Sequence, residues 1–180
     1  MIMAIVQIAG YFGLMNWLPT IMQKQLNLTV SSSTWIIATI LGMCAGMFTF
    51  GWILDVLGPR LAFGIFLVCS AIGVFVLTLP NNMVTLIIAG AVVGYFSNGM
   101  FAGYGAVVSH LYPTEIRATA NNVIMNTGRC IGGFSSLVIG WILDNHSVMT
   151  VMVFISILYI ISLIAMLSIS NLRPAKYRQF

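Results

Sequence analysis

The chain has 180 residues, of which 60% are hydrophobic and only 6% are charged. Soluble domains carry about 25% charged residues, so this composition excludes a soluble globular domain and indicates an integral membrane protein. The formal net charge is +4. With so few charged side chains, their positions along the chain say more than their sum.

Six long apolar segments follow one another with only short polar connections. Each comes close to or exceeds the ~20 residues that a helix needs to cross a membrane. They cover residues 2–22, 33–54, 61–79, 83–108, 118–143 and 148–170. The sequence therefore predicts an all-α membrane protein in which residues 1–171 form a bundle of six transmembrane helices. A basic cytoplasmic tail, residues 172–180, follows the bundle.

The basic residues predict the orientation of this bundle. If the spans alternate in direction, one side receives Arg60, Arg117, Arg173, Lys176 and Arg178. Only Lys24 falls on the other side, and short loops rich in Lys and Arg stay in the cytoplasm. We therefore expect a multi-pass protein of the inner or plasma membrane with both termini in the cytoplasm.

A five-residue sequence occurs twice, about half the chain apart. Gly51-Trp52-Ile53-Leu54-Asp55 ends the second span, and Gly140-Trp141-Ile142-Leu143-Asp144 ends the fifth. With alternating spans the two copies lie at opposite faces of the membrane. That placement predicts an inverted repeat of three plus three helices.

The fifth span carries a charge where a membrane helix rarely has one. Asn122, Asn126 and Arg129 are spaced so that they share one face of a helix. Arg117 begins the same span, and twelve residues at the helical rise place Arg129 roughly 18 Å deeper, near the middle of a ~30 Å hydrocarbon layer. A guanidinium keeps its proton, so it needs an anion, carbonyl groups or a water-filled cavity. The three acidic residues of the chain all lie near the interfaces and leave it without an anion at that depth.

Other polar side chains fall at a similar depth in the first and fourth spans. Buried amides in a membrane collect where protein or water faces them. We therefore expect the first, fourth and fifth spans to line an interior, and the third and sixth spans to face lipid. The predicted substrate site at the membrane midplane comprises Gln7, Tyr11, Tyr95, Asn98, Asn122, Asn126 and Arg129.

The turn between the second and third spans carries a recognisable pattern. Gly51, Asp55, Gly58 and Arg60 are spaced as Gly-x-x-x-Asp-x-x-Gly-x-Arg. This pattern resembles the loop signature of the major facilitator superfamily, although Val56 stands where that family usually has a basic residue. The resemblance implies that the turn helps to close one side of a transporter, with Asp55 meeting the start of the fifth span.

A second motif lies between the fourth and fifth spans. Tyr112-Pro113 and Arg117 are similar to the loop between helices ten and eleven in sugar-type and organic-acid-type members of that superfamily. Those relatives usually carry Glu where this chain has His110, and Glu115 is the candidate replacement. The resemblance implies a gating set of Gly51, Asp55, Gly58, Arg60, His110, Glu115 and Arg117.

The sequence from Asn126 to Gly133 resembles the eleventh helix of proton-coupled organic-anion members. The whole chain thus resembles the second half of a twelve-helix transporter. This resemblance implies alternating-access transport of a small organic anion such as a carboxylate, coupled to protons, with a second six-helix half or another copy as partner.

Two alternatives stay open. The substrate is a neutral sugar or polyol and Arg129 pairs with a carboxylate of the other half, or the chain is a truncated product that is inactive alone. An intramembrane enzyme is disfavoured, because motifs such as Gly-x-Ser-Gly and His-Glu-x-x-His are absent from the sequence. We predict no cofactor, metal or nucleic acid as a ligand; the partners are the substrate, protons and the lipid bilayer.

Overall fold

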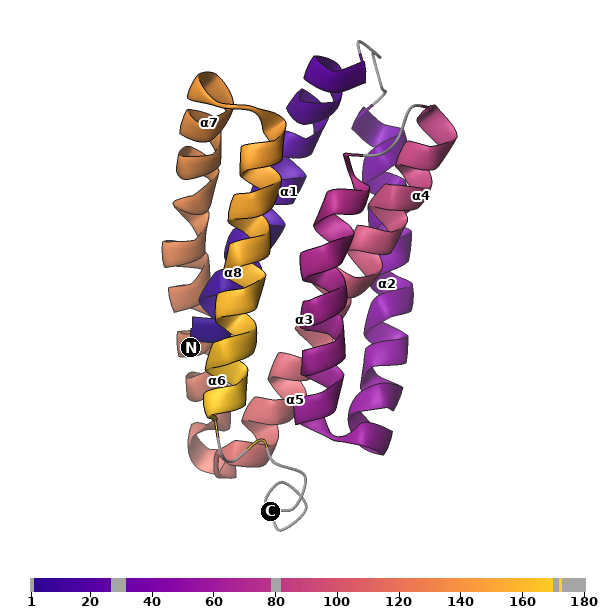
Figure 1. Ribbon diagram of the computed structural model, residues 1–180. Helices are drawn as coiled ribbons and strands as arrows, with labels where there is room; N and C mark the ends of the chain where they lie inside the picture. The colour runs from indigo at the N-terminus through magenta and orange to yellow at the C-terminus, as the bar shows by residue number, and fades with distance from the viewer. Residues whose placement is uncertain (1, 27–31, 79–81, 170–171, 173–180) are drawn as a thin grey trace.

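The computed structural model describes residues 2–26, 32–78, 82–169 and 172, which are almost entirely helical and contain no strand (Figure 1). The elements are α1 (Ile2–Leu26), α2 (Ser32–Leu57), α3 (Pro59–Val76), α4 (Met83–Val93), a π-helix η1 (Gly94–Asn98), α5 (Phe101–Leu111), α6 (Thr114–Gly133), α7 (Ser135–Asn145) and α8 (Val148–Ser168). The predicted tail lies outside the described residues, apart from Leu172.

Four stretches among the described residues are long and apolar enough to cross a membrane: Trp35–Leu57, Pro59–Val76, Ile87–Leu111 and Val148–Ser168. The chain is therefore a multi-pass membrane protein. The apolar part of α1 over Ile2–Trp17 is shorter, and α6 is too polar to qualify. Six membrane crossings remain a prediction, although every predicted span falls on one helix or on two or three consecutive helices.

Two of the predicted spans are not continuous α-helices. The fourth contains the π-helix η1, in which backbone hydrogen bonds join residues five apart instead of four. The fifth divides into α6 and α7 at Phe134, just after Gly132 and Gly133, two residues of low helix propensity. The backbone N–H of Phe134 donates to the Ile131 carbonyl at 3.2 Å, so the turn tightens without reversing the chain.

The helices pack as an inverted repeat requires. α1 lies against α6 and α7, α2 lies against α4, η1 and α5, and α3 pairs with α8. In an inverted repeat, α1, α2 and α3 correspond to α4–η1–α5, α6–α7 and α8, in that order. The packing of α1 on α6 and α7 is then equivalent to the packing of α4–η1–α5 on α2. The third packing joins α3 to its own counterpart, α8. The repeated sequences end α2 at the lower end of the bundle and α7 at the upper end (Figure 1). The fold is thus built as two intertwined three-helix repeats, the arrangement expected for half of a twelve-helix bundle.

Glycines allow the two equivalent packings to be close. A Cβ at Gly132 would lie 2.9 Å from the backbone nitrogen of Ala9 on α1. A Cβ at Gly99 would lie 2.8 Å from the backbone of Gly46 on α2. These contacts between backbones leave no room for a side chain, which is how small residues bring membrane helices together.

The outer helices α3 and α8 turn apolar side chains outward and keep polar ones inside. Ile160 and Ile164 of α8 are exposed, whereas Ser156, Tyr159 and Ser162 are buried. Ser156 donates to the Ala71 carbonyl of α3 at 3.1 Å, so polar bonding joins the two helices. This pattern agrees with the expectation that these two helices face lipid.

Candidate functional site

A pocket of about 280 Å³ opens between α1, α2, α5 and α6, with Arg129 in its lining. The other lining residues are Ile8, Tyr11, Phe12, Met43, Met47, Phe101 and Met125. α5 contributes Phe101 alone, and each of the other helices contributes residues that share one face, such as Met43 with Met47 and Met125 with Arg129. Among the described residues, this lining contains one cation and no acid, and its other side chains are aromatic, aliphatic or methionine.

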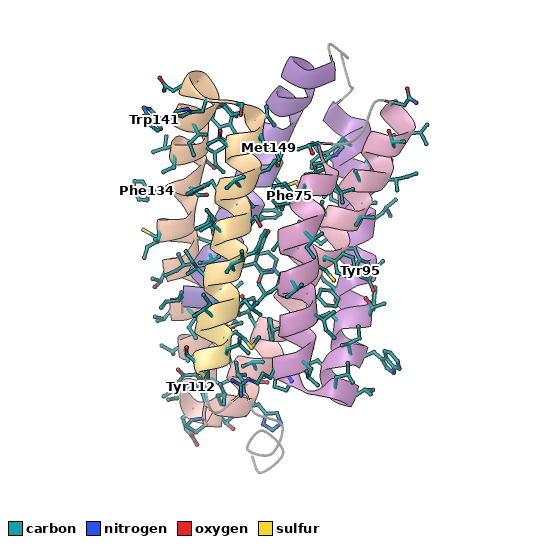
Figure 2. All side chains as sticks on the ribbon, in the orientation of Figure 1. Phe75, Tyr95, Tyr112, Phe134, Trp141 and Met149 are labelled. Atoms are coloured by element: carbon teal, nitrogen blue, oxygen red, sulfur yellow. The ribbon has the colours of Figure 1, made fainter. Side chains whose placement is uncertain are left out.

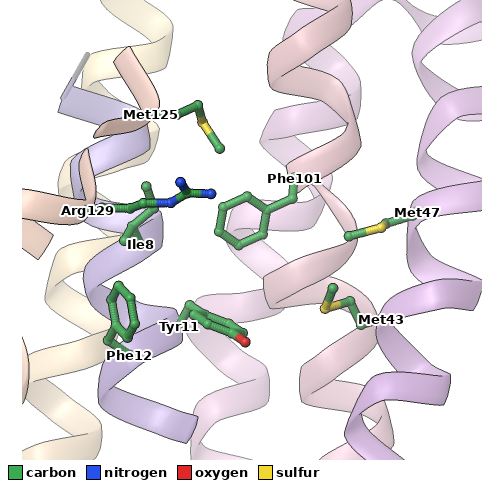
Figure 3. Close-up of a pocket in the computed structure, with 8 residues that line it drawn as sticks. All are labelled: Ile8, Tyr11, Phe12, Met43, Met47, Phe101, Met125 and Arg129. Atoms are coloured by element: carbon green, nitrogen blue, oxygen red, sulfur yellow. The ribbon is translucent and has the colours of Figure 1, made fainter. Parts of the chain in front are cut away.

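Gly128 and Gly132 determine where Arg129 points. Both are buried against α1, and a Cβ at Gly128 would lie 2.6 Å from the Ile8 side chain. Arg129 follows Gly128 by one residue, so it projects about 100° around the helix from the contact with α1. Its guanidinium extends into the pocket toward the Phe101 ring (Figure 3).

The guanidinium has little bonding within the part of the chain that the structure describes. One of its nitrogens donates to Asn126 Oδ1 at 3.5 Å, which is a long hydrogen bond. Arginine has five N–H donors in a planar fork, so most remain available. The structure thus brings together Arg129, Asn126 and, across the pocket, Tyr11.

Tyr11 and Phe101 form the aromatic wall of the pocket. Their ring centroids lie 5.9 Å apart at an interplanar angle of 84°, an edge-to-face contact. Three methionines complete the lining, and methionine side chains adapt easily to the shape of a bound molecule. The wall can therefore pack against a flat apolar skeleton while Arg129 binds a negative group.

Gln7 and Asn98 lie outside the pocket lining, inside the bundle. Gln7 is fully buried and its Nε2 donates to the Ser97 carbonyl of η1 at 2.9 Å. Ser97 also hydrogen-bonds Tyr159 of α8, so this group of residues joins three helices. Gln7 Oε1 and Asn98 Oδ1 are buried without a partner among the described residues.

Tyr95 and Asn122 are not brought into the pocket. Tyr95 packs on the Phe66 ring of α3, with centroids 5.8 Å apart and planes 22° from parallel. Asn122 is exposed on α6, two turns before Arg129. A substrate role for either residue, and for Gln7 and Asn98, stays a prediction.

The turn between α2 and α3 depends on a glycine. Gly58 has φ 82° and ψ 164°, a conformation that residues with a Cβ rarely adopt, and its N–H donates to the Leu54 carbonyl at 2.9 Å. Asp55 is exposed one turn earlier, and a Cβ at Gly51 would meet no atom within 4 Å. α2 ends on one side of the lower end of the bundle and α6 begins on the other, so the structure does not bring Asp55 to the start of α6 (Figure 1).

The remaining gating candidates lie at the same end of the molecule. The Arg60 guanidinium donates to the Leu167 carbonyl in the last turn of α8. Arg117 Nε donates to the Tyr112 carbonyl at 3.4 Å, while His110 and Glu115 are exposed. Their part in gating is untested and stays a prediction.

The sequence reasoning missed the apolar residues of the pocket. Met43 and Met47 are one helical turn apart, and Phe12 follows Tyr11, but these spacings recur throughout a chain that is 60% hydrophobic. Only the charge of Arg129 distinguished one face of one helix. Aromatic and methionine residues at the same membrane depth as Arg129 are the sequence feature that could have indicated the other walls of the pocket.

Comparison with known proteins places the chain in one family. The family model described as Major Facilitator Superfamily matches residues 1–179. A Haemophilus influenzae protein named for metabolite transport is 39% identical over 161 residues, covering 89% of this chain and 40% of that protein. No solved structure matches the chain significantly.

Two further relatives carry names that state a substrate. The cis,cis-muconate transport protein of Acinetobacter baylyi is 23% identical, covering 77% of this chain and 34% of that protein. The niacin transporter of the same organism is 23% identical, covering 76% of this chain and 31% of that protein. The chain therefore spans well under half the length of these curated relatives.

Proposed function

Because the chain belongs to the Major Facilitator Superfamily and is a transporter component rather than an enzyme, we propose that it carries a small organic anion across the membrane by alternating access. Arg129 binds the carboxylate of that anion. The observation that supports this assignment is the guanidinium of Arg129 in an apolar pocket whose lining contains no acid.

The positive charge of Arg129 favours an anionic ligand. A guanidinium within the hydrocarbon layer is costly unless an anion, backbone carbonyls or water compensate it. The long bond to Asn126, at 3.5 Å, leaves most of its donors available. A carboxylate accepts two parallel N–H bonds from such a fork, which adds orientation as well as free energy.

The pocket also favours a type of carbon skeleton. The Phe101 and Tyr11 rings meet edge to face, and three methionines surround them. A flat, conjugated or aromatic acid packs well on such a wall. Two relatives are named for cis,cis-muconate and niacin, which are unsaturated acids, and this agrees with the proposed class.

The transporter needs a second six-helix half. The volume of about 280 Å³ is at the lower limit for ligand sites, which usually measure ~300–1,000 Å³. α6 is exposed along most of its length, including Asn122 and Asn126. A second half, or another copy of the chain, would complete the site by covering the exposed face of α6.

Coupling to protons is part of the proposal. An inward proton gradient can drive uptake, since the membrane potential contributes about 2.3 kcal/mol per charge per 100 mV. The acidic residues of this chain lie near the ends of the spans, so we place the proton-carrying acid in the other half. The gating set at the lower end, which includes Asp55 and Arg60, would close the cytoplasmic side of a plasma-membrane transporter.

The test is uptake into proteoliposomes that contain the complete transporter of which this chain is part. Labelled nicotinate, muconate, glucose and sorbitol are compared with and without an imposed proton gradient, in the parent and in Arg129→Gln. We expect the gradient to increase uptake of the acids, and Arg129→Gln to remove that uptake.

Uptake of glucose or sorbitol, but not of the acids, would instead support the neutral-substrate alternative, in which Arg129 pairs with a carboxylate of the other half. Reconstitution of this chain alone separates the remaining readings. Activity would indicate that two copies suffice, and inactivity restored by the other half would indicate a half-transporter.

A further inference from the structure

An apolar groove runs between α3 and α8, on the face of the bundle that does not contain the Arg129 pocket. It has a volume of about 550 Å³. Its lining residues are Arg60, Leu61, Gly64, Ile65, Val68, Cys69, Leu163, Met166 and Leu167. A second hollow of about 290 Å³ shares Val68 and Leu163 and continues the groove as far as Phe75, which lies between α3 and α8 (Figure 2).

The groove has one charged end. Among the described residues of its lining, Arg60 is the only charged one, and it stands in the first turn of α3. One of its nitrogens donates to the Leu167 carbonyl, which holds the guanidinium at the mouth of the groove. The other N–H donors of the fork remain available for an anion.

The 550 Å³ part of the groove, next to Arg60, corresponds in length to one leaflet. From Arg60 to Cys69 the helical rise gives about 13 Å. Half of a ~30 Å hydrocarbon layer is about 15 Å. A chain that enters beside Arg60 would therefore end near the membrane midplane, with its charged group at the interface.

We propose that this groove binds a phospholipid with an anionic headgroup, from the leaflet on the Arg60 side. Its phosphate bonds the Arg60 guanidinium, which suits the geometry of phosphate oxygens. One acyl chain lies along Gly64, Val68 and Leu163. The site is distinct from the substrate pocket, because the two linings share no residue.

Charge complementarity favours this occupant over a second protein chain. Exposed isoleucine and leucine residues such as Ile65, Ile72 and Ile164 flank the groove, as on a surface that faces lipid. Basic pockets between membrane helices on the cytoplasmic side bind anionic headgroups.

Native mass spectrometry of the complete transporter tests the proposal. Dioleoyl phosphatidylglycerol and dioleoyl phosphatidylcholine share their acyl chains and differ in net charge. Both lipids carry the phosphate, but in phosphatidylcholine the choline cation cancels its charge, so only phosphatidylglycerol brings a net negative charge to Arg60. We expect the parent to bind the anionic lipid about fivefold more tightly, since one basic residue near an anionic headgroup contributes about 1 kcal/mol. Arg60→Gln should remove this preference while keeping a donor for the Leu167 carbonyl, and Arg117→Gln, at the same end but outside the groove, should keep the preference.

Gly64 offers a second variant that does not touch the charge. A Cβ there would meet only Met166 Cε, at 3.5 Å, an ordinary contact. Gly64→Ala should therefore bind both lipids as the parent does, whereas Gly64→Leu should fill the groove and weaken binding of both.

Equal binding of the two lipids by the parent would overturn the proposal, as would an unchanged preference in Arg60→Gln. Parent-like binding in Gly64→Leu would overturn the assignment to this groove. A dimer of the transporter that Gly64→Leu dissociates would show that a second copy occupies the groove instead.

Discussion

α6 and α8 have nearly the same length, 20 and 21 residues, and opposite arrangements of polarity. α6 buries Gly128 and Gly132 and exposes Asn122, Asn126 and Arg129. α8 exposes isoleucines and buries Ser156, Tyr159 and Ser162. Burial alone therefore does not predict polarity in this molecule, because the outer face of α8 is expected to contact lipid, whereas the exposed face of α6 requires water, a ligand or a partner.

A charge introduced on each helix tests this difference most strongly. Ile160→Lys on α8 should lower the yield of folded protein sharply, because lysine at the centre of a membrane helix costs about 2.5–3.5 kcal/mol. Val123→Lys on α6, exposed to a similar extent, should be tolerated. The yield is measured by size-exclusion chromatography of protein extracted from the membrane. Equal losses in the two variants would mean that α6 also faces lipid.

The contact between α1 and α6 gives a second test, with an effect of intermediate size. Gly132→Ala should lower the thermal unfolding midpoint, because its Cβ would lie 2.9 Å from the Ala9 nitrogen and overpacking costs about 1–3 kcal/mol. Gly133→Ala is the matched control, since its Cβ would meet no atom within 4 Å. Its midpoint should stay the same or rise slightly, because alanine favours a helix. Identical midpoints for both variants would contradict the close packing of α1 on α6.

The smallest effect comes from a pair of polar side chains. Asn126→Ala should raise the KM for the transported acid about two- to tenfold, because one hydrogen bond near the carboxylate contributes about 0.5–1.5 kcal/mol. Ser162→Ala should leave KM unchanged, since the Ser162 hydroxyl is buried in α8 without a partner among the described residues. Uptake kinetics provide the measurement. An increase in KM for Ser162→Ala as large as that for Asn126→Ala would remove the functional distinction between the two helices.

The sequence predicted the helical class and the repeat because both depend on simple patterns. Long apolar segments require helices in a membrane, and the duplicated Gly-Trp-Ile-Leu-Asp indicated the symmetry. The π-helix η1 and the break at Phe134 were not predicted. Such irregularities depend on tertiary packing around glycines, which a hydropathy pattern does not report.

The site was predicted in part for the same reason. A charge in an apolar helix can be recognised from sequence, so Arg129 was among the predicted residues, and it lines the pocket together with the predicted Tyr11. Their part in binding stays a prediction. Which face a nearly uniform apolar helix turns inward depends on its neighbours, and a π-helix rotates the following residues by about 100°. The sequence therefore could not predict that Tyr95 packs on Phe66 or that Gln7 bonds the Ser97 carbonyl.

The most direct test of the central claim is equilibrium binding of one matched ligand pair to the complete transporter. Isothermal titration compares the carboxylic acid that is transported best with its carboxamide, in the parent and in Arg129→Gln. If Arg129 binds the carboxylate, the variant should bind the acid about 10- to 100-fold more weakly and the amide as before, since a charge-assisted bond contributes about 1.5–3 kcal/mol. Equal weakening of both ligands, or of neither, would contradict the claim.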